Sequence, residues 1–166
     1  DTSIAISLDI MRKCRSGLLK MGHDVQFRAL FVEKDKKAFA KLDTFLSSQI
    51  DNTIQTKPLN GEFIDLQGEI LKWCGPDDFA FFFIDPKGWR HSIEIPTLRP
   101  LLQRRNSEYL INFMFDFLLR AHTQENYKEH MLEVFGEVPN TDGMTPKERE
   151  THLLKLYREH LKKAQP

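Results

Sequence analysis

The most apolar stretch of the chain is Phe79-Ala80-Phe81-Phe82-Phe83-Ile84, and Asp85-Pro86-Lys87-Gly88-Trp89 follows it directly. A continuous apolar run that ends in turn residues is typical of a parallel strand buried on both faces of a sheet. Residues 27–32 and 109–114 form two further runs of this kind. We therefore expect these runs to be strands of a sheet that is covered by helices on both sides.

Segments with helical periodicity lie between these runs. Apolar residues recur at spacings of three and four in four segments, residues 1–21, 35–50, 62–73 and 96–105, while residues 53–57 have the composition of a weak edge strand. Strand and helix thus alternate four times. This order predicts an α/β fold with an open, doubly wound, mostly parallel sheet and right-handed crossovers.

The last third of the chain has helical patterns at residues 124–135 and 146–163 and no convincing strand. Thr145-Pro146-Lys147-Glu148 has the form of a capping box with proline at the first helical position. We expect an α/β domain over residues 1–120 and a helical C-terminal extension over residues 121–166 that packs on it.

Composition limits the functional classes. The 166 residues carry 24 Lys and Arg against 24 Asp and Glu, so the zero net charge gives no support to a nucleic-acid partner. The sequence has no apolar run of membrane-spanning length, and its two cysteines form no disulfide framework. With no leader visible, we expect a cytoplasmic protein.

Carboxylates follow three of the four predicted strands. In doubly wound sheets ligands bind beyond the carboxyl ends of the strands, where Glu33, Glu62 and Asp85 are expected. Such groups accept hydrogen bonds from ribose hydroxyls or an exocyclic amine, and Trp89 offers a ring for stacking. The sequence therefore predicts a ligand with a ribose and an aromatic base.

Each of these residues also has a purely structural interpretation. Glu33, Asp35 and Glu62 lie at predicted helix starts, where carboxylates cap the helix or favour its dipole. Residues 85–88 fit a type I turn, and Trp89 fits simple packing.

The histidines give weaker indications. His91 follows Trp89 and is a candidate base. His122 and His130 are eight residues apart, too far for one metal ion, so we expect them to be solvated.

Four blocks of sequence occur in a characteristic order: Leu30-Phe31-Val32-Glu33-Lys34-Asp35, Asn60-Gly61-Glu62-Phe63, Phe82-Phe83-Ile84-Asp85-Pro86-Lys87-Gly88-Trp89 and Tyr109-Leu110-Ile111-Asn112-Phe113-Met114. Over residues 2–136 the chain thereby resembles the three-Cys-motif partner protein family, which is similar to S-adenosylmethionine-dependent methyltransferases with a Rossmann-like fold. The resemblance implies that Glu33 holds the cofactor's ribose and that Glu62 and Phe63 hold its adenine. It also implies that Asp85, Pro86 and Trp89 form the acceptor side, although Lys87-Gly88 replaces the second proline of the related amino-methyltransferase motif.

The resemblance also implies a missing part. In this family a first strand and a glycine-rich loop precede a segment like residues 2–6, and no G-x-G-x-x-G occurs in this sequence. The absent strand belongs between the strands at residues 27–32 and 79–84. Because two open strand edges in a sheet interior are costly, we expect an upstream segment or another chain to occupy this position.

Two functional hypotheses follow from the resemblance. The first is an S-adenosylmethionine-dependent methyltransferase whose acceptor is an amine or a nucleic-acid base. The second is a non-catalytic partner of a three-cysteine-motif protein that bears a metal or cluster, with residues 124–164 as the docking surface. A nucleotide-binding regulator is a third interpretation.

Overall fold

The computed structural model describes residues 3–49, 53–86, 92–113, 115 and 127–166. The chain divides into two compact units, Asp1–Leu66 and Gln67–Pro166. Within the described residues, no helix is long and apolar enough to cross a membrane.

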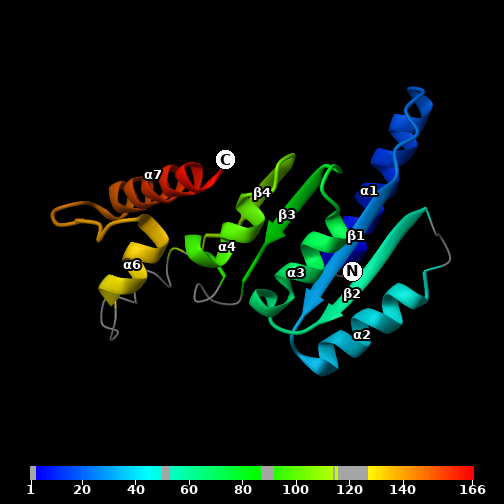
Figure 1. Cartoon of the computed structure of the whole chain (residues 1–166), viewed down its shortest axis with the longest axis horizontal. Coiled ribbons are helices and arrows are strands. Elements are labelled where there is room, and N and C mark those ends of the chain that lie inside the picture. Colours follow the sequence, from blue (N-terminus) through cyan, green and yellow to red (C-terminus); the bar gives the residue numbers. More distant parts are fainter. Residues whose placement is uncertain (1–2, 50–52, 87–91, 114, 116–126) are drawn as a thin grey trace. The chain divides into compact units, whose positions relative to one another are not determined.

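The first unit combines two helices with one pair of parallel strands (Figure 1). Its elements are α1 (Ser3–Lys20), β1 (Phe27–Glu33), α2 (Lys36–Ser47) and β2 (Ile54–Asn60). The register of the pair runs from Phe27 opposite Ile54 to Glu33 opposite Asn60. Both helices contribute apolar side chains to one core with the strands, formed by Leu8, Ala29, Leu42, Leu46 and Ile54. These helical residues belong to the apolar stripes that the sequence predicts.

Local sequence sets the ends of these helices. Gly22, with a φ of +86°, ends α1 by donating to the carbonyl of Leu19 at 3.0 Å, while the N–H of His23 donates to Leu18 at 2.9 Å. Asp35 caps α2, since its Oδ1 accepts from the N–H of Ala38 at 2.8 Å. The structural interpretation of Asp35 is therefore confirmed.

The second unit contains α4 (Ile95–Leu102), α6 (Tyr127–Phe135) and α7 (Pro146–Ala164) together with the parallel strands β3 (Ala80–Ile84) and β4 (Ser107–Ile111). A further helix, α3 (Phe63–Cys74), spans the division between the units. Helices α4, α6 and α7 contact one another, and their core includes Leu98, Leu101, Met131 and Val134, all at most 2% exposed. The predicted capping box is present at the start of α7. The predicted boundary at residue 120 lies outside the described residues.

The strands β3 and β4 are not buried on both faces, contrary to the sequence prediction. Alternate side chains point to opposite sides of a strand, and Ala80 and Ile84 lie on the packed side. On the other side Phe81, Phe83 and Leu110 are 54–60% exposed. The continuous apolar run at residues 79–84 therefore does not predict burial on both faces, because an apolar sequence does not specify how many faces of the sheet are covered by other elements.

The described strands form two separate two-stranded parallel sheets, β1–β2 and β3–β4. A mixed α/β architecture is confirmed. The predicted strand at residues 53–57 runs on to Asn60, past Pro58, and within the described residues β2 pairs only with β1, an edge position in which proline is tolerated.

Candidate functional site

The parallel pairing of β1 and β2 brings Glu33 and Asn60 side by side at the last position of the register. The side-chain amide of Asn60 donates to the backbone carbonyl of Glu33 at 2.8 Å, and the N–H of Gly61 donates to the same oxygen at 3.3 Å. Glu62 follows, and its Oε1 lies 3.4 Å from Nζ of Lys34. The structure therefore brings Glu33 and Glu62 to the same end of the strand pair, as the sequence predicts.

The carboxylate of Glu33 is oriented by its own loop. Its Oε1 accepts from the N–H of Asp35 at 2.9 Å, so part of the structural interpretation holds. A carboxylate has about four acceptor positions, and one hydrogen bond leaves capacity for a ligand. Glu62 and Lys34 are 59% and 62% exposed, and an ion pair in such a setting is weak and exchangeable. Phe63, half-buried, begins α3 beside them.

Asp85 and Pro86 directly follow β3 in the second unit. The Asn112 amide donates to Oδ1 of Asp85 at 2.7 Å, and the Asn112 N–H donates to the Ile84 carbonyl at 2.8 Å. The residues that directly follow β3 and β4, Asp85 and Asn112, are thus in direct contact. Residues 87–91, which include Trp89 and His91, lie outside the described residues, so the type I turn and the stacking role of Trp89 stay predictions.

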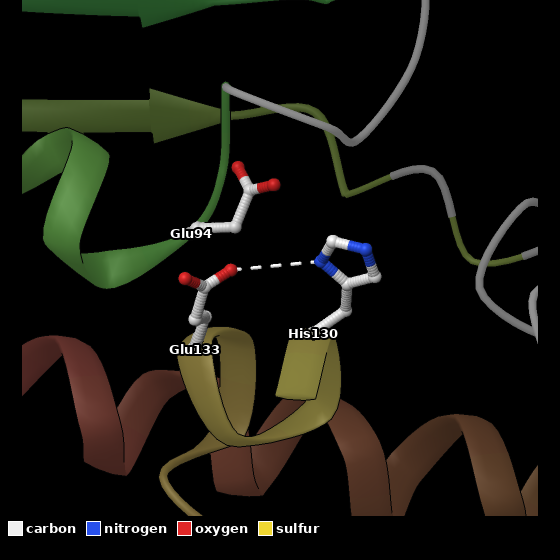
Figure 2. Close-up of side chains that lie close together, drawn as sticks. All are labelled: Glu94, His130 and Glu133. Atoms are coloured by element: carbon white, nitrogen blue, oxygen red, sulfur yellow. Dashed lines mark ion pairs between the residues drawn. The ribbon is translucent and has the colours of Figure 1, made fainter. Parts of the chain in front are cut away.

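A second cluster was not predicted from the sequence: Glu94, His130 and Glu133 (Figure 2). The nitrogen and carboxylate oxygens that these residues offer as ligands all lie within 4.8 Å of one another. The expectation that His130 is solvated is wrong, since its side chain is 18% exposed. The eight-residue spacing between His122 and His130 gives no sign of this cluster. The H-x-x-E spacing of His130 and Glu133, which puts both on one helical face, was the informative pattern.

Glu94 is the buried member of this cluster, with 3% of its surface exposed. It precedes α4, and its Oε2 accepts from the N–H groups of Ser92 at 2.9 Å and Ile93 at 3.2 Å. The hydroxyl of Tyr157 donates to the carbonyl of Ile93 at 2.9 Å. Burial, and to a lesser extent the negative charge of Glu94, raises the pKa of Tyr157 well above its ordinary value, so this hydroxyl stays a donor.

The two members of the cluster on α6 are one helical turn apart. Nδ1 of His130 lies 3.6 Å from Oε2 of Glu133, which is longer than a hydrogen bond but suits two ligands of a common ion. Glu133 is 41% exposed, so the cluster is open to solvent on this side.

No protein-family model, curated protein or solved structure shows a significant match to this chain. The function is therefore argued from the residues themselves.

Proposed function

We propose that this protein is an S-adenosylmethionine-dependent methyltransferase, with the cofactor at the carboxyl ends of β1 and β2. The observation that carries the proposal is the meeting of Glu33, Asn60 and Glu62 at one end of a parallel strand pair. Ligands of doubly wound sheets bind at this end of the strands.

The residues at this end fit the adenosine part of the cofactor. Glu33, held by the N–H of Asp35, has acceptor capacity left for two vicinal ribose hydroxyls. Glu62 offers an acceptor for the exocyclic amine once it leaves Lys34, and Phe63 offers an apolar contact for the base. When bound, the cofactor supplies the electrophilic methyl group.

Asp85 is the proposed acceptor-side residue. The amide of Asn112 fixes one oxygen of its carboxylate, so the second oxygen is oriented to accept a hydrogen bond from an acceptor amine. Pro86 restricts the backbone beside it, and Trp89 is assigned to the acceptor by sequence alone. Catalysis of this kind depends mainly on holding the reacting groups close and aligned.

In this proposal the fold is of the doubly wound, mostly parallel, methyltransferase-like type. Its support is that both described strand pairs, β1–β2 and β3–β4, are parallel. We also propose a cytoplasmic location, which fits the lack of a disulfide framework.

Calorimetric titration with S-adenosylhomocysteine tests the cofactor site. We expect 1:1 binding that weakens by about tenfold or more in Glu33→Gln, because a hydrogen bond to a charged group contributes about 1.5–3 kcal/mol. Asp43→Asn is the matched control, since Asp43 is an exposed carboxylate on α2 of the same unit. No heat of binding at millimolar ligand, or equal affinities for Glu33→Gln and the control, would reject the proposal.

The exposed face of β3–β4 favours a second candidate, the non-catalytic partner of a three-cysteine-motif protein. Phe81, Phe83 and Leu110 form an apolar surface of the kind that marks protein interfaces. Co-purification with that companion from a co-expressing cell tests this. Loss of capture in Phe81→Ser with retention in Asp85→Ala supports the partner role, while retention in both contradicts it.

A further inference from the structure

Three side chains that the proposed methyl transfer does not use lie together in the second unit: Glu94, His130 and Glu133 (Figure 2). We propose that they bind one divalent transition-metal ion, and that Zn²⁺ is the ion that their chemistry favours. The proposed site joins the segment before α4 to helix α6. It does not depend on S-adenosylmethionine binding.

The spacing of the ligand atoms suits one small ion. Each ligand of a tetrahedral zinc ion lies about 2.1 Å from the metal, so two ligands are about 3.4 Å apart. Nδ1 of His130 and Oε2 of Glu133 are 3.6 Å apart, and all three ligand atoms lie within 4.8 Å of one another. Closing the widest separation takes a shift of about 1 Å or slightly more. The side chain of Glu133 is 41% exposed, so it has room to rotate toward a bound ion.

Two of the three ligands are held in position by the fold. The N–H groups of Ser92 and Ile93 orient the carboxylate of Glu94, and the hydroxyl of Tyr157 fixes the carbonyl of Ile93. His130 lies on helix α6, one turn before Glu133, and its side chain is largely buried. Metal ligands in proteins depend on such surrounding hydrogen bonds for their orientation. Three protein ligands leave the fourth tetrahedral position for water.

The ligand set discriminates between ions. Mg²⁺ and Ca²⁺ prefer oxygen ligands alone, whereas one imidazole with two carboxylates suits Zn²⁺. A buried carboxylate is costly unless its charge is balanced, and Glu94 is 97% buried. A divalent cation bound at the cluster would contribute to this balance. The competing explanation is that His130 pairs directly with the two glutamates and that the cluster binds no metal.

Calorimetric titration with zinc chloride separates the two explanations. The titration calls for tag-free, metal-stripped protein with Cys14→Ser, because an exposed free thiol such as that of Cys14 can bind zinc by itself. We expect saturable 1:1 binding that is at least about tenfold weaker in His130→Ala and in Glu133→Gln, the loss typical of disturbing even the surroundings of a metal site. The matched controls His152→Ala on α7 and Glu129→Gln on α6 should bind as the parent does.

Thermal unfolding with and without zinc distinguishes loss of the metal site from a general loss of folding in a variant. Zinc should raise the thermal unfolding midpoint of the parent and of both controls, since a ligand that binds the folded state stabilises it. At the same zinc concentration it should raise the midpoint of Glu133→Gln by less than that of Glu129→Gln, and Mg²⁺ should raise none. Binding of zinc with equal affinity by Glu133→Gln and Glu129→Gln, or no saturable binding by the parent, would overturn the proposal. S-adenosylhomocysteine binding that persists in Glu133→Gln keeps this outcome distinct from failure of the cofactor site.

Discussion

The two units carry polar clusters of opposite character. In the first unit, Lys34 and Glu62 meet with about 60% of each side chain exposed, and both come from loops next to strand ends. In the second unit, Glu94 is 97% buried and meets two residues that lie more than 30 positions later in the chain. Solvent screens the first cluster, so its charges can exchange partners for a ligand at little cost. The second is fixed by the core, so its loss should disturb the fold.

The largest expected effect comes from removing Glu94. Glu94→Ala leaves the buried N–H of Ile93 and the part-buried N–H of Ser92 without the acceptor that Glu94 provides, and a buried group of this kind costs about 1–3 kcal/mol. We expect the free energy of unfolding to fall by about 2–4 kcal/mol. Glu62→Ala, at the exposed cluster, should change it by less than about 0.5 kcal/mol. Urea unfolding measures the free energy of unfolding of both variants. Equal losses in Glu94→Ala and Glu62→Ala would contradict the view that the buried cluster supports the fold and the exposed one does not.

A smaller effect is expected from Tyr157→Phe, which keeps the ring packing but leaves the carbonyl of Ile93 without its donor. The expected loss is about 1–2 kcal/mol. Because the folded state raises the pKa of this hydroxyl, the unfolded chain ionises first above pH 10.0, and stability falls as pH rises further. The parent should therefore lose more stability than Tyr157→Phe between pH 10 and 11. Parallel pH profiles for the two proteins would contradict the buried environment of Tyr157.

A smaller effect on stability is expected at the capping box of Thr145 and Glu148, which is exposed but should stabilise the protein more than the exposed ion pair of Lys34 and Glu62 does. In the capping box, the N–H of Thr145 donates to Glu148 at 2.9 Å and the N–H of Glu148 donates to Oγ1 of Thr145 at 3.4 Å. Thr145→Ala should cost about 1 kcal/mol, the usual value for an N-cap residue. Urea unfolding of Thr145→Ala measures this loss. A loss of this size would show that exposed hydrogen bonds can contribute to stability when they satisfy N–H groups at the start of a helix.

The same capping box gives a pH dependence. Hydrogen bonds from Thr145 lower the pKa of Glu148 below its ordinary 4.5. The stability that Glu148 contributes is therefore present above pH 4.5 and is lost as pH falls below it. Helix content of the parent and of Glu148→Gln, followed by circular dichroism between pH 5 and 3, checks this. The parent should lose more stability than the variant over this range.

Local features of the fold were predictable because they depend on neighbours in the sequence. Gly22 ends α1, Asp35 caps α2 and Thr145 begins α7, each through bonds to residues within a few positions. The order of strands and helices followed from periodicity for the same reason. It also placed Glu33 and Glu62 at neighbouring strand ends, because parallel strands that pair bring their carboxyl ends together.

The tertiary structure alone decided which apolar and polar residues are buried. The sequence favoured burial of Phe81 and Phe83 on both faces of a sheet, yet both are exposed. It favoured a solvated His130, yet packing of α6 against α4 brings this residue to a buried glutamate. Contacts between residues more than 30 positions apart depend on how helices pack, and no local pattern encodes that packing. The sequence by itself determined the order of the elements and local caps such as those of Asp35 and Thr145, and the packing of distant elements determined the cluster at Glu94.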